Sequence, residues 1–577
     1  MRLGTRKWSL AGLMVLMGTL ALLVSACGGS TSTTGNSDQA PASQQVLHNV
    51  MSGEADIATM DPNMVQDANS IVPIDLVWPG LLTLDKNLAV QPWAASAMPS
   101  VSPDGTTYTF KLHPGMKFSD GEPIDAAAFA FSINRSLNPC TASPVAYYLY
   151  TIKDAVTFNG ESCTGNTISA AKGQTTPVIK TLIGDSIVVV DSQTLTITLA
   201  QPAAYFLEAL TYPTSYAIPQ NLVNKYGAKW TDHLADNGGM GGNMYKLVSW
   251  PHDGTIKLVA NPNFWGTKPI IQEQDFTIYK SVETQYNAFL AGQNDFGVPP
   301  SAQYAQAKAK PDFHEVGQLW IGYYGLNWKM APFTDLGVRQ GFELALNKTA
   351  IANNVLHGTV IPTNHIVPQG MPGYNPALVG VDGTQSTDGN VAKAQALVKP
   401  YVDANCGGQY KNCPKVVLTY PSSGADETNT DTAALNMWQT AFPGWPISIQ
   451  ATDFNTLLNG MAARSLQAYS IGWIADYPDP QDWLSLQFGP NAQYNDTNVV
   501  DTQANTLMNK ADGESDQTQR LKDYEAAEQL LVTDVAWLPL FQVKAYYEVR
   551  PYVKNYVLDS QGLTPLSVWQ TVYIAKH

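Results

Sequence analysis

The alternation of apolar and polar side chains predicts that strands and helices follow one another along most of this chain. Residues 48–61 have the pattern of a first strand, which should end where Pro62 removes a backbone donor. Residues 107–112 alternate as a half-buried strand does, and Asp104-Gly105 before them favours a hairpin turn. Asp125 then precedes an apolar run and is expected to cap a helix. The pattern therefore predicts a mixed α/β chain.

A second apolar pattern, within residues 469–484, ends in an acidic turn. Residues 471–474 have the length and β-branched content of a buried strand. The strand should stop at Asp476, because Pro478 and Pro480 cannot continue a central strand or a helix interior. A carboxylate at the end of a strand is well placed to hold a cation in a cleft. The alternative is that Asp476 only opens a proline turn, since Asp favours such turns.

The first 26 residues have the pattern of an export signal rather than of folded structure. A basic start precedes a mostly apolar run at 10–24, which is short for a membrane span. Residues 24–27 read V-S-A-C and resemble a bacterial lipobox, so Cys27 is expected to become a lipid-modified amino terminus. Residues 27–45 are rich in Gly, Ser, Thr, Asn and Pro and are expected to form a flexible tether. We therefore expect an exported protein, lipid-anchored on the outer face of the bacterial cytoplasmic membrane.

Charge and length narrow the classes of partner. The signal contains three cations and no acids, so the remaining chain carries 30 Lys and Arg against 48 Asp and Glu. This acidic balance argues against nucleic acid or anionic lipid as the ligand. No later stretch has the roughly 18 consecutive apolar residues that a spanning helix needs, and the chain is long enough for two or three lobes.

Four cysteines besides Cys27 suggest disulfides in an oxidising compartment. Pairing Cys140 with Cys163 and Cys406 with Cys413 is the simplest of three possible connectivities. A zinc site is the rival, but these spacings lack paired C-x-x-C and the eight histidines contain no i, i+4 pair. We expect neither a metal nor a cofactor.

One block carries a strong family resemblance. Residues 108–121 read Y-T-F-K-L-H-P-G-M-K-F-S-D-G, within a longer matching block at 101–137. This block resembles the signature region of extracytoplasmic solute-binding proteins of family 5, which serve peptide-type ABC importers. Further segments resemble the same family, and some of them its oligopeptide-binding branch; they are residues 141–149, 245–264, 285–295, 332–346 and 572–577. The resemblance extends from about residue 48 to the carboxyl terminus.

The resemblance implies an α/β architecture of the class II, or cluster C, periplasmic-binding-protein type. Such a protein is a hinged two-lobe trap with an extra inserted lobe, which gives three lobes and closes on its ligand. Lobe I would contain residues 46–79, 201–320 and 536–577. Lobe II would contain 80–200, and lobe III would contain 321–535.

The resemblance also implies a peptide site. Gly472-Trp473-Ile474-Ala475-Asp476 matches a G-W-x-A tetrad followed by the aspartate that pairs with the α-ammonium of a peptide in oligopeptide-binding proteins. The strand before this aspartate would offer its backbone to an extended ligand, opposite residues 66–68. The residues expected to bind ligand are Asp476, Trp473, Gly472, Ile474, Tyr148, Gln66, Ala68, Tyr323 and Tyr324. Each aromatic residue could instead be ordinary core.

One position departs from the oligopeptide binder. An arginine that can take the carboxylate of the ligand stands there two residues before the Gly-Trp pair, whereas this chain has Ser470. Arg464 is the nearest cation upstream. Longer or carboxyl-blocked peptides are therefore plausible ligands, and the partners implied are a peptide and the membrane permease subunits of an ABC transporter, with the protein itself a monomer.

Two other functions are consistent with parts of the sequence. Relatives of this fold also bind oligosaccharides, nickel complexes or opines, and Trp438, Trp445, Trp473 and Trp483 could stack on sugar rings.

A secreted hydrolase is the other alternative, in which Asp476, Asp479 and Asp482 would supply paired carboxylates. G-x-S-x-G and H-E-x-x-H are absent, and Asp479 sits in a proline-flanked turn, so we expect no enzyme.

Overall fold

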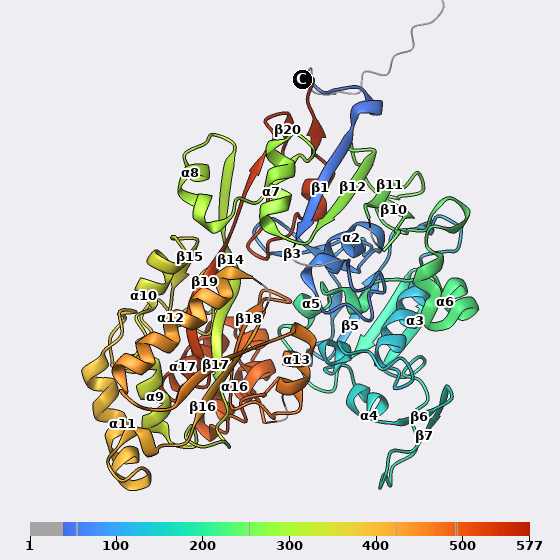
Figure 1. Ribbon diagram of the computed structural model, residues 1–577. Helices are drawn as coiled ribbons and strands as arrows, with labels where there is room; N and C mark the ends of the chain where they lie inside the picture. The colour runs from blue at the N-terminus through green and yellow to red at the C-terminus, as the bar shows by residue number, and fades with distance from the viewer. Residues whose placement is uncertain (1–37, 53–55, 253, 423, 491, 493) are drawn as a thin grey trace, which may run out of the picture.

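The computed structural model describes residues 38–577 except 53–55, 253, 423, 491 and 493 (Figure 1). The signal peptide expected at 1–26 and the lipidation site expected at Cys27 lie outside the described residues. Within them the fold is α/β, with three larger sheets and helices packed around them. None of the described helices combines the length and the apolar character that crossing a membrane requires.

The amino-terminal sheet has the strand order β1-β12-β11-β10. Its strands are β1 (Val46–Ser52), β12 (Glu273–Tyr279), β11 (Ile256–Ala260) and β10 (Tyr245–Ser249), and β1 runs parallel to β12. β1 is shorter than the strand predicted at 48–61. The N–H groups of Ala58 and Thr59 donate to Oγ of Ser70, at 3.0 and 3.2 Å, instead of to a neighbouring strand. Ser70 lies in helix α2 (Ala68–Val77).

The inserted sheet comes from the chain between β1 and β10 and has the order β4-β5-β9-β8. Its antiparallel strands are β4 (Ser100–Val101), β5 (Thr107–Lys111), β9 (Thr194–Thr198) and β8 (Ile187–Asp191). Helix α3 (Ala126–Leu137) packs on it, and the predicted cap Asp125 accepts hydrogen bonds from the N–H groups of Ala127 and Ala128. The disulfide Cys140–Cys163 joins the chain after α3 to a small hairpin.

The large sheet has seven strands in the order β13-β19-β14-β18-β16-β17, with β15 added on β19. Two of them are long, β14 (Phe313–Leu326) and β19 (Leu538–Val549), and both run from the upper part of the molecule into the part at the lower left of Figure 1. The other strands are β13 (Phe296–Gly297), β18 (Ala468–Ile474), β16 (Val416–Pro421), β17 (Ile447–Thr452) and β15 (Val360–Pro362).

Helices surround the large sheet and connect the other elements. Those of the large-sheet region are α9 (Leu336–Leu344), α10 (Lys348–Ala350), α11 (Val391–Asn405), α12 (Ala425–Ala441), α13 (Phe454–Ala462), α14 (Pro480–Trp483), α15 (Ser485–Phe488), α16 (Thr502–Gly513) and α17 (Gln517–Thr533). The remaining helices are α4 (Ala155–Asn159), α5 (Phe206–Ala209), α6 (Gln220–Tyr226), α7 (Val282–Leu290), α8 (Tyr304–Lys308) and α18 (Leu566–Trp569). The disulfide Cys406–Cys413 follows α11. Both disulfides have the local pairing that was simplest from the sequence.

The apolar core divides the molecule into two main parts. The amino-terminal and inserted sheets share one continuous cluster, to which Leu47 and Phe110 both belong. The large sheet has clusters of its own on its two faces, with Leu418 in one and Ile321 in the other. Because the two parts have separate cores, the boundary between them is where a cleft can form.

Residues 38–45 do not behave as the tether that the sequence predicted. Gln39 forms a β-bridge with Ala575, and the side-chain amide of Gln45 donates to the carbonyl oxygens of Ala40 and Ile574, at 2.9 Å each. The N–H of Ile574 donates back to Oε1 of Gln45 at 2.8 Å. A composition poor in apolar residues predicted flexibility, but these hydrogen bonds with the carboxyl-terminal segment hold the segment in place.

Candidate functional site

The candidate site begins at the edge of β18. Residues 468–474 pair with β14 along one side, with Gly472 opposite Gly322 and Ile474 opposite Trp320. On the other side, the β16 pairing stops at Tyr469. In the part of the chain that the structure describes, no strand pairs with residues 470–474 on that side. The backbone there forms an open sheet edge that ends at Asp476.

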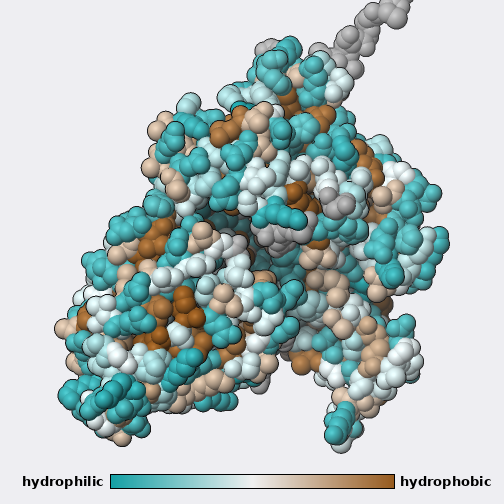
Figure 2. All heavy atoms as spheres, in the orientation of Figure 1, coloured by the Kyte–Doolittle hydropathy of each residue, from teal (hydrophilic) through white to brown (hydrophobic). Residues whose placement is uncertain are grey.

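A cavity lies at the end of this edge. Residues from both main parts of the molecule line it. Ile474 and Asp476 approach from the large sheet, and Gln66 and Ala68 approach from the turn before α2 and its first residue. The face of the molecule that Figure 2 shows is hollowed near its centre, between the upper part of the molecule and the lower left part. The structure thus brings together four of the residues that the sequence predicted.

Asp476 is the chemical centre of these residues. Its Oδ2 accepts a hydrogen bond from the hydroxyl of Tyr148, which comes from the inserted-sheet region. Burial raises the pKa of Asp476 to about 7, and the hydrogen bond from Tyr148 partly offsets that rise. A neighbouring positive charge would lower this pKa again.

Asp482 fixes the loop that carries Asp476. This buried carboxylate accepts hydrogen bonds at its Oδ2 from the N–H of Asp476 at 3.1 Å and from Nε1 of Trp473 at 3.2 Å. Its pKa lies well above the ordinary value, chiefly because of burial and then because of the charge of Asp476. The indole of Trp473 also meets the ring of Tyr494 edge-on, with centroids 4.8 Å apart. Trp473 therefore positions the loop rather than lining the cavity.

Gly472 allows the ring of Trp320 to approach the β18 backbone closely. A Cβ at this position would overlap the indole of Trp320, which lies across the β18 backbone. The glycine of the Gly-Trp pair thus lets an aromatic ring pack directly on the strand that leads to Asp476.

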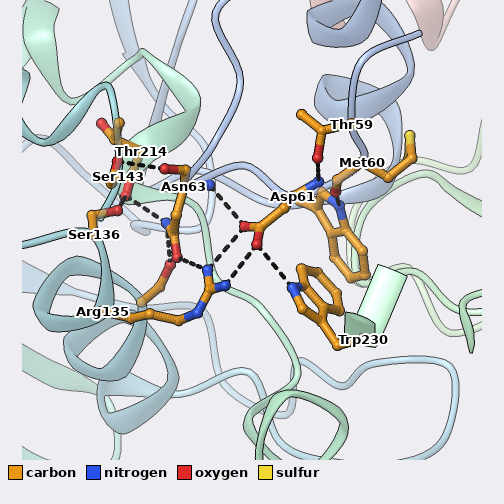
Figure 3. A network of polar contacts seen from close by, with 11 residues as sticks. Thr59, Met60, Asp61, Asn63, Arg135, Ser136, Ser143, Thr214 and Trp230 are labelled. Atoms are coloured by element: carbon orange, nitrogen blue, oxygen red, sulfur yellow. Dashed lines mark hydrogen bonds and ion pairs between the residues drawn. The ribbon is translucent and has the colours of Figure 1, made fainter. Parts of the chain in front are cut away.

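A buried polar network supports the opposite wall of the cavity (Figure 3). Arg135 of α3 donates to both carboxylate oxygens of Asp61, at 2.9 and 2.7 Å, and to Oδ1 of Asn63 at 2.6 Å. Nε1 of Trp230 donates to Asp61 at 2.9 Å, and the hydroxyl of Ser143 donates to the carbonyl oxygen of Asn63 at 2.5 Å. The network holds the segment before Gln66 against the segment that leads to Tyr148, so these two segments of the same wall are fixed relative to each other.

Tyr323 and Tyr324 are not placed as the sequence predicted. Tyr323 stacks on Trp537 with ring centroids 3.6 Å apart, and Tyr324 packs near Trp438 at 5.5 Å, both inside the large-sheet cores. Neither lines the cavity described above. β14 is covered on both faces in this stretch, so alternation cannot bring either ring to the surface.

The residues invoked for the two alternative functions are mostly structural. Trp438, Trp445 and Trp483 are buried in the cores and present no face to a sugar. Asp479 accepts two hydrogen bonds from the guanidinium of Arg520, at 2.7 and 2.6 Å. A carboxylate held in this way is not a free acid or base.

The position of Ser470 also lacks a compensating cation. The pKa of the buried Asp431 is influenced by the nearby hydroxyls of Tyr324 and Ser470. Nε of Arg464 donates to the carbonyl oxygen of Asn495 at 3.1 Å. Ser470 carries no charge, and Arg464 does not line the cavity. The cavity lining contains no Lys, Arg or His.

Sequence reasoning missed the contribution of the carboxyl-terminal segment. The side-chain amide of Gln561 donates to the carbonyl oxygens of Ala475 and Asp476, at 2.9 and 3.3 Å, and Asp559 lines the same cavity. Asp75 of α2 lines it as well. These residues are far apart in sequence and follow no local motif, so only the fold reveals that they meet.

Comparisons with known proteins agree with this architecture. Over 564 residues, 96% of this chain and 98% of the other, the chain is 25% identical to the oligopeptide-binding protein OppA of Bacillus subtilis. The structure is similar to that of the murein tripeptide binding protein MppA of Escherichia coli, with a TM-score of 0.77, 22% identity and coverage of 92% of this chain and 99% of that one. It is also similar to Haemophilus influenzae OppA in complex with the peptide RPPGFSPFR, with a TM-score of 0.75, 23% identity and coverage of 92% and 99%.

A family model decides the assignment. It describes the middle region of bacterial extracellular solute-binding proteins of family 5 and matches residues 89–495. This match covers well over half of the chain and includes the inserted sheet, most of the large sheet and Asp476. The chain therefore belongs to the bacterial extracellular solute-binding proteins of family 5.

Proposed function

We propose that this protein is the substrate-binding lipoprotein of an ABC importer and binds extended oligopeptides between two closing lobes. The amino-terminal ammonium of the peptide pairs with Asp476, and the peptide backbone adds to the open edge of β18. The protein then delivers the peptide to permease subunits in the membrane. It acts as a receptor and catalyses no reaction.

The observation that carries this proposal is an unpaired strand edge that ends in a carboxylate with no cation beside it. A strand edge binds any extended peptide through its backbone, whatever its side chains. A carboxylate at the end of that edge fixes where the peptide begins. A charge-assisted hydrogen bond of this kind contributes roughly 1.5–3 kcal/mol.

The relatives support a peptide as the ligand. The Bacillus subtilis protein is named as an oligopeptide-binding protein, and the Haemophilus influenzae structure contains a nonapeptide. An extended ligand also suits a chain without a fixed cation at Ser470, because no group there sets the position of the ligand carboxylate.

The division of the core supports closure around a hinge. In this proposal the amino-terminal and inserted sheets form lobes I and II, and the large sheet forms most of lobe III. β14 and β19 connect these parts and would carry the hinge. A ligand that touches both sides of the cavity favours the closed state by its differential affinity for that state.

Membrane attachment rests on the sequence. An export signal at residues 1–26 followed by a lipobox cysteine, Cys27, supports a lipid anchor at the outer face of the cytoplasmic membrane. An anchor of this kind would keep the receptor close to its permease. Labelling cells with a radioactive fatty acid should mark the protein, and Cys27→Ser should abolish the label.

Calorimetry with a small peptide panel tests the binding mode. Asp476→Asn should weaken the binding of trialanine at least tenfold, and acetylation of the peptide amino group should weaken binding to the natural protein by a similar factor. Asp185→Asn removes an exposed carboxylate of the inserted-sheet region and should leave the affinity unchanged. If both the substitution and the acetylation are silent, Asp476 is not the anchor.

A further inference from the structure

The cavity beside Asp476 is lined by more carboxyl groups than one ammonium requires. Four aspartates line it, namely Asp67, Asp75, Asp476 and Asp559, and its lining includes no basic side chain. Among the described residues, no group of His, Cys, Asp and Glu side chains is arranged to hold a metal ion.

Asp559 is the most deeply placed of the four. Its residue is 4% exposed, and its Oδ1 accepts hydrogen bonds from the N–H groups of Gln561 at 2.8 Å and Leu563 at 3.1 Å. Burial raises the pKa of Asp559 to about 7 despite these backbone donors. One oxygen thus holds the turn of a residue that lines the cavity.

Asp75 supplies a second carboxylate to this region. Its Oδ1 is buried and has no hydrogen-bond partner among the described residues. The hydroxyl of the neighbouring Tyr216 donates to the carbonyl oxygen of Thr211 at 2.8 Å. Burial raises the pKa of Asp75 to about 7, the nearby Tyr216 hydroxyl partly opposes the rise, and the charge of Asp559 adds to it. Two mutually repelling carboxylates therefore share a region without a cation.

A second cavity continues from this region and is lined by aromatic rings. Asp75, Leu563 and Thr564 line both cavities, so the two adjoin. The rings of the second cavity are those of Phe276, Phe296, Tyr547, Tyr556 and Trp569. Aromatic faces attract cations and also accept the methylene stem of a long basic side chain.

The position of these groups relative to Asp476 is set by one glutamine. The N–H of Gln561 donates to Asp559, and its side-chain amide donates to the carbonyl oxygens of Ala475 and Asp476. The two carboxylates thus stand on backbone segments that touch. In the binding mode proposed above, a ligand whose amino end is held at Asp476 would have its first residue beside the segment that carries Gln561 and Asp559.

From this arrangement we infer that Asp75 and Asp559 form a subsite for a cationic side chain on the first residue of the ligand, which selects peptides that begin with Lys or Arg. The inference rests on the proposed function, because it takes Asp476 as the anchor of the peptide amino group. Ionised carboxylates in a cavity whose lining has no basic side chain are unfavourable in the empty protein, and a ligand cation supplies the opposite charge.

Calorimetry with two matched peptides tests the subsite in the purified protein. Lys-Ala-Ala and norleucine-Ala-Ala have first side chains of similar shape and differ in charge. The natural protein should bind the lysine peptide about tenfold more tightly, a difference of about 1.4 kcal/mol. Asp559→Asn keeps the acceptor for the turn and, like Asp75→Asn, should remove most of this preference while leaving the affinity for the norleucine peptide nearly unchanged.

A control variant and a second probe separate this inference from the proposed function. Asp382 lies outside the cavity, and its carboxylate accepts a hydrogen bond from the N–H two residues further along the chain, as that of Asp559 does. Asp382→Asn should therefore keep the preference for the lysine peptide. Asp476→Asn should weaken both peptides by the same factor. Equal affinities for the two peptides would overturn the subsite and leave the peptide receptor intact. One outcome is that no peptide binds, that 1,5-diaminopentane binds, and that Asp559→Asn abolishes the binding of the diamine; the subsite then stands and the peptide function fails. If neither the peptides nor the diamine bind, both the subsite and the peptide function are overturned.

Discussion

The hydroxyl of Tyr148 donates a hydrogen bond to Oδ2 of Asp476, although 328 positions separate the two residues in the sequence. Its neighbour Tyr147 forms a hydroxyl–hydroxyl contact of 2.8 Å with Tyr494. Two adjacent tyrosines of the inserted-sheet region thus bind the segment that follows β18. Asp476 already has one donor before any ligand arrives, so in the proposed binding mode a ligand ammonium would share this carboxylate with Tyr148 or displace it.

Replacing Tyr148 with Phe should shift the pH dependence of binding. The hydrogen bond from Tyr148 lowers a pKa that burial raises to about 7. Without it the pKa of Asp476 rises further, by roughly 1 unit for a charge-assisted bond. The pH at which trialanine affinity is half lost on the acid side should therefore move upward, as measured by calorimetry between pH 5.5 and 8.5. Tyr150→Phe, which removes a hydroxyl bonded to Asn159 instead, should cause no shift; a downward shift for Tyr148→Phe would contradict this assignment.

The natural protein should bind peptides best near neutral pH. Below the pKa of about 7, binding an ammonium requires Asp476 to lose a proton first, so affinity should fall by up to about tenfold per pH unit. Above roughly pH 8 the peptide loses its own proton, because a free α-amino group titrates at about 7.7–8.0. The affinity for trialanine should therefore peak between these limits. Asp476→Asn should flatten the acid side of the curve, and a natural protein with constant affinity from pH 5 to 8 would refute the role of this carboxylate.

The part of the site that the sequence predicted depends on local chemistry. An apolar run followed by Asp476 and two prolines defines a strand end and a turn without reference to the rest of the chain. The structure places β18 and its open edge there. Asp75 and Asp559 could not be predicted in this way. Each lies in an ordinary local context, and only the packing of the carboxyl-terminal segment against α2 brings them together.

The same distinction explains the errors in the fold. Tyr323 and Tyr324 looked like candidates for a cleft because they lie just after the boundary between lobes I and III that the resemblance implied, yet β14 is buried on both faces there. Residues 38–45 have a composition typical of a linker, but Gln45 bonds to Ile574 at the other end of the chain. Composition reports what a segment can do alone, whereas long-range hydrogen bonds decide what it does in the fold.

Asp431 should make the stability of the large-sheet part depend on pH. Asp431 lies in α12, and its burial raises its pKa from 3.8 to about 7, although the hydroxyls of Tyr324 and Ser470 partly oppose the rise. Between these two values the folded protein holds a proton that the unfolded chain has lost. The free energy of unfolding should therefore decrease as pH rises from about 4 to 7 and then level off.

Asp431→Asn removes this dependence. The variant should be more stable than the natural protein at pH 8, by on the order of a few kcal/mol, and the gain should shrink toward pH 5. Thermal unfolding at the two pH values measures the difference. Asp403→Asn replaces a carboxylate that is 51% exposed and should show no such trend. A gain that is equal at both pH values would mean that Asp431 is not the titrating group.

The buried pair between Arg520 and Asp479 should be the most sensitive point of the loop behind Asp476. The side chains are 0% and 5% exposed, and the pairing is bidentate. Arg520→Met leaves a buried carboxylate without its cation, which typically costs about 3–5 kcal/mol of unfolding free energy. Urea denaturation should show a correspondingly lower midpoint.

A double variant identifies the cause of that loss. Residue 479 caps α14 by accepting a hydrogen bond from the N–H of Gln481. Adding Asp479→Asn removes the uncompensated charge but keeps an acceptor for this N–H. The double variant should therefore recover part of the lost stability. Lys399→Met breaks a surface pair with Asp403 and should change the unfolding free energy by no more than about 0.5 kcal/mol. If the double variant is no more stable than Arg520→Met alone, the loss comes from the missing packing of the arginine side chain and not from the charge left on Asp479.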